Sequence, residues 1–337
     1  MVDLQSEKAL IRAYQDEMEA AGPEGVRDVL ARFGAPDWHW RGMHPFNEQH
    51  GPDQIAAAFW EPYRRAFPRM QRRVDIFIAG LNEIDGFQGR WVVEMGHLMG
   101  LFDAPWLGIP PTYRIAMLRF AEFNRVKNGR VVETAMFIDI PHLMVQAGRN
   151  PFPPQTGAHL VQPGPRTHEG LCYGPQDPAR GEASLAAINA LLNNPPAAAL
   201  GIPEGDRLRR VWHDDMIWWG PAGIGATFTI ERYLRQHSSP FGKALWSERR
   251  FNGHLCRLAE GDFGGFFGWP NLTLRNTGGF MGMPAGAITA DMRVVDLYRV
   301  REGKLAENWI FIDMLNFYAM QGLDVLERMA AVEAGGG

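Results

Sequence analysis

The chain has 337 residues, of which 46% are hydrophobic and 21% are charged, and its formal net charge is −4. This composition predicts a folded globular protein of two domains, because a single hydrophobic core rarely extends beyond ~250–300 residues. The slightly negative charge excludes the basic footprint of proteins that bind nucleic acid or anionic membranes. Only two cysteines occur, without metal-ligand spacing, and neither a signal-peptide pattern nor an apolar run of about 18 residues is found, so we expect a cytoplasmic protein.

The first half of the chain shows helical patterns followed by a run of strands. Residues 6–32 predict two helices that are separated near Gly22-Pro23. A short strand is expected at 37–40, and a helix begins at Pro52-Asp53. Strand-like stretches follow at 72–84, 89–102, 113–126 and 130–140, and Asn128-Gly129 between the last two is a strong hairpin signal.

Residues 151–170 are rich in proline and glycine and predict an extended linker that can still wrap over a domain. Beyond the linker the same order returns. Helical patterns occur at 182–194 and 227–241, and strand-like patterns at 209–219 and within 251–276. We therefore expect a first domain at 1–150, a linker at 151–172 and a second domain at 173–337.

The second half repeats the first half in sequence as well as in order. Residues 108–140 align without a gap with residues 282–314, an offset of 174 (282 − 108), and both segments contain the tripeptide Phe-Ile-Asp. A period this long indicates two copies of a whole domain rather than a solenoid. Helices followed by antiparallel strands predict an α+β class, with two tandem cone-shaped domains, each a curved, mostly antiparallel sheet with helices over its concave face.

Several residues in this repeat resemble the pattern of the SnoaL-like polyketide cyclases, a family with the cone-shaped nuclear transport factor 2 fold. The pattern consists of His97, Gly100, Gly108-Ile109-Pro110-Pro111-Thr112, Gly129, Glu133, Asp139 and Gln146-Ala147-Gly148. The resemblance implies that the aspartate after the last strand, Asp139 in the first copy and Asp313 in the second, is a general acid or base in an apolar cavity. It also implies a catalytic role for His97, whose position in the second copy holds Asn271.

The strand that leads to each aspartate favours the same chemistry. Because alternate residues of a strand share a face, Glu133 and Phe137 should point the same way as Asp139. A carboxylate buried inside the cone beside aromatic rings has a raised pKa, which suits proton transfer next to a carbonyl group without a metal or cofactor. His97 is the expected donor to the enolate. Two alternatives remain: each aspartate caps the turn that follows it, or Glu133 and Glu307 are the working acids.

Nine aromatic and polar residues are predicted to bind the substrate. They are Trp40, His44, Trp60, Tyr63, Phe137, Trp219, Asn271, Trp309 and Phe311. Trp40 and Trp219 are interpreted as counterparts in the two copies, and plain core packing is the alternative for the tryptophans.

Histidines at 39, 44 and 50 with Glu48 are of the type that binds a metal. Their spacing fits no ligand pattern, however, and the second copy lacks them, so we expect neither a metal nor a cofactor. Arg119 and Arg125, which recur as Arg293 and Arg299, are interpreted as structural.

Together these features predict an enzyme that acts on a small, largely apolar carbonyl compound by aldol-type cyclisation, isomerisation or hydration. The alternatives are a non-catalytic protein that binds a hydrophobic small molecule and a module for assembly. We expect the two copies to pair as an intramolecular pseudo-dimer. Further pairing of chains into a homodimer is left open.

Overall fold

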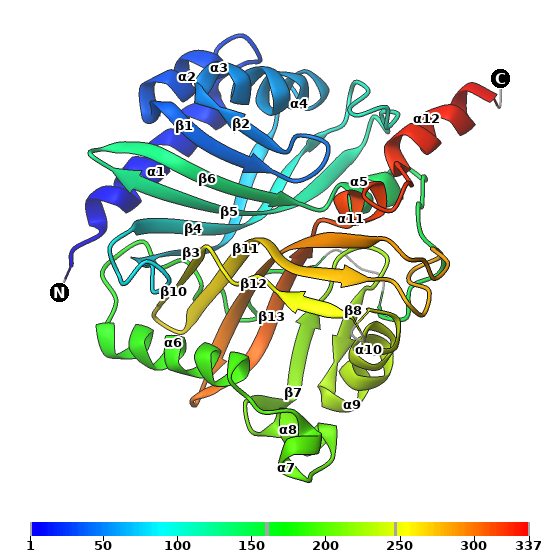
Figure 1. Ribbon diagram of the computed structural model, residues 1–337. Helices are drawn as coiled ribbons and strands as arrows, with labels where there is room; N and C mark the ends of the chain where they lie inside the picture. The colour runs from blue at the N-terminus through cyan, green and yellow to red at the C-terminus, as the bar shows by residue number, and fades with distance from the viewer. Residues whose placement is uncertain (1, 159–161, 246–247, 336–337) are drawn as a thin grey trace.

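The computed structural model describes residues 2–158, 162–245 and 248–335, which form two curved β-sheets, each with its own helices (Figure 1). The predicted α+β class with two tandem cone-shaped domains is confirmed. Both cysteines are free thiols in the interior. Among the described residues, no helix combines the length and the apolar character that a membrane crossing requires.

The first sheet has the strand order β2-β1-β6-β5-β4-β3, in which the β1–β6 pair is parallel and the other pairs are antiparallel. Its strands are β1 (Gly34–Gly42), β2 (Glu48–His50), β3 (Gln71–Leu81), β4 (Arg90–Leu101), β5 (Ile115–Lys127) and β6 (Arg130–Ile138). Its helices are α1 (Gln5–Ala20), α2 (Val26–Phe33), α3 (Gly51–Ile55), α4 (Glu61–Ala66) and α5 (Ile140–Gln146), with a π-helical turn at Ala56–Trp60 between α3 and α4. Figure 1 shows α1 to α4 gathered on one side of this sheet.

The second sheet repeats this topology with the order β10-β11-β12-β13-β7-β8, and the short β9 also pairs with β11. Its strands are β7 (Trp212–Trp219), β8 (Ala226–Phe228), β9 (Arg249–Phe251), β10 (Cys256–Glu260), β11 (Phe263–Arg275), β12 (Thr289–Arg301) and β13 (Lys304–Ile312). Its helices are α6 (Pro178–Leu192), α7 (Ala197–Leu200), α8 (Glu204–Arg209), α9 (Thr229–Tyr233), α10 (Ser239–Leu245), α11 (Met314–Ala319) and α12 (Val325–Gly335), with a π-helical turn at Leu234–Ser238.

The strand registers confirm the duplication and correct one detail of it. The predicted hairpin turns between β5 and β6 and between β12 and β13 both form, with positive φ at Asn128 and Glu302 and at the glycine after each. Trp40 lies opposite Thr134, and Trp218 lies opposite the equivalent Asn308. The predicted counterpart of Trp40, Trp219, is therefore wrong by one residue. The paired residues are 94 positions apart in the first copy (134 − 40) and 90 apart in the second (308 − 218). One fixed offset therefore cannot relate both strands of the two copies.

Aromatic rings fill much of the concave side of the first sheet. Phe59 of the π-helical turn packs on Tyr63 at 5.6 Å and on Trp106 at 6.1 Å between ring centroids. Trp40 and Trp60 contact the same ring, and all five side chains are almost completely buried. For Trp40, Trp60 and Tyr63 the structure thus agrees with the alternative of core packing.

One polar cluster interrupts this apolar core. The Nη1 atom of Arg72 lies 2.9 Å from Oε2 of Glu122 and 3.0 Å from Oε2 of Glu94, and neither carboxylate is exposed to solvent. Burial raises the pKa of Glu94 to about 8; the charge of Glu122 acts in the same direction and that of Arg72 opposes it. We therefore expect the buried carboxyl group of Glu94 to keep its proton at neutral pH.

The outer, convex faces of the two sheets pack against each other. Phe267 of β11 is fully buried, and its ring contacts the rings of Trp91, Phe123 and Phe137 at centroid distances of 5.8, 5.1 and 6.2 Å. At the edge, Lys8 donates to Glu260 at 2.5 Å and to the carbonyl of Cys172 at 2.6 Å. The two halves thus share one core, as the predicted pseudo-dimer requires.

Two aspartates fasten this interface by the same contacts in each half. Oδ1 of Asp139 accepts from the backbone N–H of His142 at 3.1 Å, and Oδ2 accepts from that of Ala222 in the second domain at 3.0 Å. Asp313 repeats this arrangement: Oδ1 accepts from the N–H of Asn316 at 3.2 Å and Oδ2 from that of His44 in the first domain at 3.0 Å.

These contacts distinguish the two interpretations of the aspartates, which were an acid or base inside the cone and a cap of the turn that follows. The predicted alternation is confirmed, because Phe137 shares its face of β6 with the strand end at Asp139. The predicted position inside the cone is wrong, because this face contacts Phe267 and Trp269 of the other domain. The capping alternative is confirmed for both, since each aspartate is the N-cap of the helix that follows. Burial raises the pKa of Asp313, although the charge of Arg293, 3.2 Å away, opposes it.

Replacement of Asp139 should destabilise the whole chain. We expect Asp139→Ala to lower the free energy of unfolding by roughly 2 kcal/mol, because it removes the side-chain acceptor of the buried Ala222 N–H and one of the two acceptors of the His142 N–H. Urea denaturation followed by tryptophan fluorescence measures the effect. Asp177→Ala is the matched control, since Asp177 caps α6 through one exposed hydrogen bond and should cost less than Asp139→Ala. Equal losses in the two variants would contradict the interdomain contact.

The proton on Glu94 should make stability depend on pH. Between the ordinary pKa near 4.5 and about 8, the folded protein retains a proton that the unfolded chain has released, so stability falls as pH rises through this window. The free energy of unfolding of Glu94→Gln should therefore rise, relative to that of the unmodified chain, by roughly 4 kcal/mol from pH 5 to pH 9. Urea denaturation at the two pH values tests this. Glu24→Gln, at an exposed position, is the control, and a constant difference for Glu94→Gln would show that Glu94 does not retain this proton.

Candidate functional site

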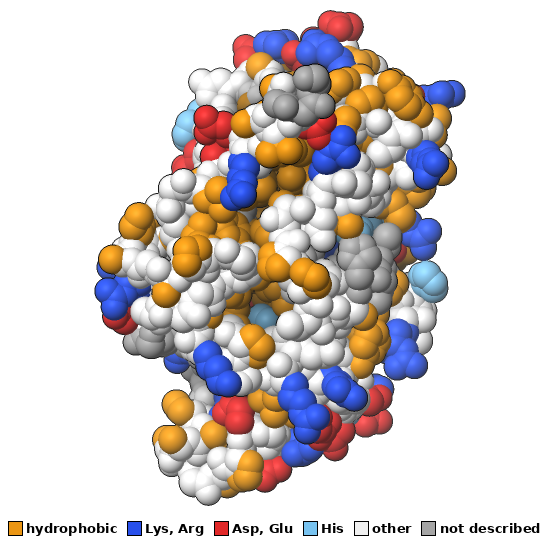
Figure 2. Space-filling view, turned by 90° about the vertical axis from the view of Figure 1, so that its right-hand side faces the viewer, with side chains coloured by type: hydrophobic (Ala, Val, Ile, Leu, Met, Phe, Trp, Pro, Cys, Tyr) orange, Lys and Arg blue, Asp and Glu red, His pale blue; other side chains and the backbone are white. Residues whose placement is uncertain are grey.

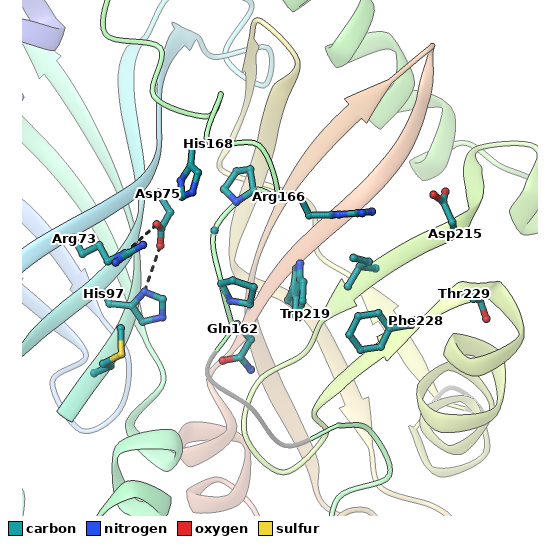
Figure 3. A pocket seen from close by; sticks show the side chains of 15 residues that line it. Arg73, Asp75, His97, Gln162, Arg166, His168, Asp215, Trp219, Phe228 and Thr229 are labelled. Carbon is teal, nitrogen blue, oxygen red and sulfur yellow. Dashed lines mark ion pairs between the residues drawn. The ribbon is translucent and has the colours of Figure 1, made fainter. Parts of the chain in front are cut away.

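A pocket with a volume of about 920 Å³ lies between the two domains (Figure 3). One wall is the outer face of β3, β4 and β5 in the first domain, and the opposite wall consists of β7, β8 and the start of α9 in the second domain. Residues 162–168 of the linker run between these walls. Such a volume is in the usual range for sites that hold a small organic molecule.

A histidine and an aspartate form the polar centre of this pocket. Nδ1 of His97 lies 3.4 Å from Oδ2 of Asp75, and both side chains are about 4% exposed. Arg73 faces the other oxygen, with its Nε atom 3.5 Å from Oδ1 of Asp75. Figure 3 shows both side chains pointing toward the carboxylate. Neither ring nitrogen of His97 has a hydrogen-bond partner within the described chain, so both remain able to bind a ligand or exchange a proton.

Asp75 reaches this position by the alternation of β3. Arg73 pairs directly with His97 across the β3–β4 ladder, and Asp75 follows Arg73 by two residues, so all three side chains share one face of the sheet. The register then shifts between Val74 and Ile76, which makes Asp75 the extra residue of a β-bulge.

The linker packs directly on this centre. A Cβ atom at Gly164 would lie 2.5 Å from the Cβ of Asp75, so only glycine permits this approach. The carbonyl of Pro163 accepts from the indole N–H of Trp309 at 2.8 Å. Gln162 donates to the carbonyl of Gly220 at 2.5 Å, while its Oε1 lacks a partner in the described chain. The linker is thus a wall of the pocket as well as a connection, and it shields the His97–Asp75 pair from water.

The remaining surface of the pocket is mainly apolar. Ile217, Trp219 and Phe228 come from the second domain and Met117 from the first. Burial also raises the pKa of Glu307, and the charge of Arg299 opposes this. Figure 2 shows that on one face of the molecule hydrophobic side chains gather across the middle, with charges of both signs scattered around them.

The structure brings together two of the predicted site residues, His97 and Trp219, and separates them from the others. Within the described chain, Phe137 and Phe311 lie in the interface between the sheets, where Phe311 is covered by the guanidinium of Arg119 at 4.0 Å. Trp309 is buried behind the linker. His44 contacts Asp313 through its backbone, and its Nε2 atom lies 3.7 Å from Asp324.

The corresponding groove in the other half is filled by a tryptophan. Trp269 lies over the guanidinium of Arg293 at 4.1 Å, contacts the ring of Phe137 at 5.5 Å and donates from Nε1 to Glu48 at 3.1 Å. Asn271, which replaces His97 there, accepts from the backbone N–H of Val294 at 2.8 Å. The two halves thus differ at this place: one has His97 facing the pocket, and the other has Trp269 and a backbone-bonded Asn271.

Asp75 and Gln162 are the site residues that the sequence analysis missed. A signal for Asp75 existed: it is the one acidic residue in the apolar run Val74–Ile78 of β3. The pairing of this part of β3 with His97 of β4 has no signature in the chain. Gln162 lies in the linker, where neither periodicity nor the repeat applies.

Comparisons with known proteins agree with this architecture. Residues 8–147 match the family model described as SnoaL-like polyketide cyclase. No protein among those with curated functions matches the chain.

Solved structures that resemble one half of the chain include a SnoaL-like protein from Jannaschia sp. CCS1, with 24% identity over 45% of this chain and 96% of that one, and a TM-score of 0.36. IdmH from Streptomyces antibioticus has 19% identity over 42% and 96% of the two chains, with a TM-score of 0.34. An NTF2-like protein from Burkholderia xenovorans LB400 has 15% identity over 42% and 96%, with a TM-score of 0.32. The match covers the strands and helices of the first cone, so the first half of the chain is similar to the SnoaL-like polyketide cyclase family.

Proposed function

We propose that the interdomain pocket binds a small to medium-sized, largely apolar carbonyl compound and that His97 transfers a proton on it. One observation carries this proposal: a buried imidazole without a hydrogen-bond partner lies beside a buried carboxylate in a pocket of about 920 Å³. The reaction belongs to the cyclase and isomerase chemistry of the family that the first domain matches.

The proposed proton transfer uses both nitrogens of the imidazole ring. Nδ1 of His97 lies 3.4 Å from Oδ2 of Asp75, and the charge of this carboxylate stabilises the imidazolium that forms. Nε2 accepts a proton from the carbon next to the substrate carbonyl. The electron pair of that C–H bond moves to the carbonyl oxygen, and the enolate is stabilised by guanidinium donors such as Arg73, which lines the pocket. Return of the proton from the imidazolium to another carbon completes an isomerisation. In an aldol cyclisation the enolate carbon attacks a second carbonyl group, and the imidazolium gives its proton to the alkoxide that forms.

The assignment replaces Asp139 and Asp313 as the acid or base. Both oxygens of each aspartate accept backbone N–H groups, which leaves the carboxylate turned to the domain interface. His97 keeps the role of an acid–base group, but its partner is Asp75.

A non-catalytic binding protein is the second candidate. It is favoured by the apolar side chains of the second-domain wall, Ile217, Trp219 and Phe228, and by the linker that covers the pocket. Binding and catalysis share the pocket, and they differ in whether the substrate loses a proton.

Exchange of carbon-bound hydrogen for deuterium in 2-tetralone, a bicyclic ketone, separates these functions. The unmodified chain in deuterated buffer should accelerate exchange next to the carbonyl, as followed by proton NMR. His97→Asn introduces the residue found at the equivalent position of the second copy and should lower the rate by about 100-fold or more. Asp75→Asn should lower it by about tenfold, because the imidazolium loses the charge that stabilises it.

Asp139→Asn is the matched control, since it keeps one oxygen acceptor at the interface and lies outside the pocket. Its exchange rate should remain within about threefold of the unmodified chain. Loss of exchange in Asp139→Asn with retention in His97→Asn would return the catalytic role to Asp139. Quenching of tryptophan fluorescence by 2-tetralone without accelerated exchange would establish the binding function instead.

A further inference from the structure

The hairpin of β1 and β2 carries a cluster that the proposed reaction does not use. His39 and His50 are directly opposite each other in the antiparallel pair, and their rings stack at 4.7 Å with an interplanar angle of 15°. Glu48 precedes His50 by two residues in β2 and so shares its face. Its Oε2 atom lies 2.8 Å from Nε2 of His39.

The three side chains offer one ligand atom each, and these atoms lie within 4.8 Å of one another. Two imidazoles and one carboxylate form the donor set that first-row divalent metals such as Zn²⁺ accept in proteins, with the remaining positions held by water. The sequence analysis expected no metal because the spacing along the chain fits no known pattern. The hairpin creates the proximity across two strands, which linear spacing cannot reveal.

The fold itself does not require histidines at these positions. In the second domain, the same pair of opposed residues on β7 and β8 is Ile217 and Phe228, which line the interdomain pocket. An apolar pair is therefore sufficient for this hairpin. The stacked imidazoles are a property of the first copy alone, and they are partly or largely exposed to solvent.

The carboxylate of the cluster is held by the other domain. Oε1 of Glu48 accepts from the indole N–H of Trp269 at 3.1 Å, which leaves Oε2 directed at His39. Partial burial acts to raise the pKa of Glu48, but the hydrogen bond and charge of His39, the Trp269 indole and the charge of Arg41 hold it below its ordinary value. The Trp269 indole thus supplies the kind of outer hydrogen bond that orients a carboxylate ligand toward a metal.

We propose that His39, Glu48 and His50 form a binding site for a divalent transition metal, with Zn²⁺ as the expected ion. The metal would replace the proton shared between His39 and Glu48. It would link β1 to β2 and, through the contact between Glu48 and Trp269, strengthen the junction of the two domains. This site is separate from the His97 pocket and does not depend on the function proposed for it.

Isothermal titration of the untagged, full-length chain with ZnCl₂ at pH 7.5, after removal of metals with EDTA, tests the proposal. We expect one Zn²⁺ per chain with a dissociation constant on the order of micromolar or tighter. His39→Ala and His50→Ala should each weaken binding at least tenfold. Trp269→Phe retains the ring but removes the donor to Glu48, and should weaken binding between about threefold and tenfold.

His168→Ala is the matched control, because His168 is an exposed histidine on the linker and should leave Zn²⁺ affinity unchanged. Thermal unfolding supplies a readout that does not depend on binding heat: Zn²⁺ should raise the melting temperature of the unmodified chain and of His168→Ala, but not of His50→Ala. The proposal would be overturned if the double variant His39→Ala/His50→Ala bound Zn²⁺ as tightly as the unmodified chain does. It would also be overturned by loss of binding in His168→Ala, or by the absence of both binding heat and a melting-temperature shift at 1 mM Zn²⁺.

Discussion

The structure depends on the burial of one sheet face against another. Each cone has an outer face with large apolar side chains, and in this chain the two faces cover each other around Phe267. Hydrophobic contact of this kind is not directional, so further contacts are needed to fix the mutual position of the sheets. Two hydrogen bonds fix this position: the backbone N–H of Ala222 donates to Asp139, and that of His44 donates to Asp313. The residues that the family resemblance marks as catalytic are thereby used to join the halves.

The two halves differ most where the interface opens. In one groove, His97 and Asp75 face a pocket lined by apolar residues of the other domain. In the other groove, Trp269 occupies the space and Asn271 is bonded to the backbone. A duplicated chain can keep its interface while only one groove contains a histidine, because the packing of the sheets does not use this side chain.

Much of the fold could be predicted from the chain, and much of the site could not. The 174-residue offset and the turns at Asn128-Gly129 and Glu302-Gly303 are local or repeated signals, so they predicted two equivalent sheets. Alternation also correctly grouped Phe137 with Asp139. Alternation does not say which face of a sheet is concave, however, and here the face with the aspartate is the convex one. The bulge at Asp75 and the path of Gln162 are decided by tertiary contacts, and a single offset could not recover the shift that makes Trp218 the counterpart of Trp40.

The path of residues 162–168 has a consequence for how such a protein can evolve. Two separate cones related by a twofold axis would present two identical grooves. A fused chain has a single connecting segment, which can lie over one groove and never over both. Covalent joining therefore breaks the equivalence of the two grooves before any side chain changes. The uncovered groove then faces water and is free to be filled, as Trp269 fills it, while selection on the shielded one continues.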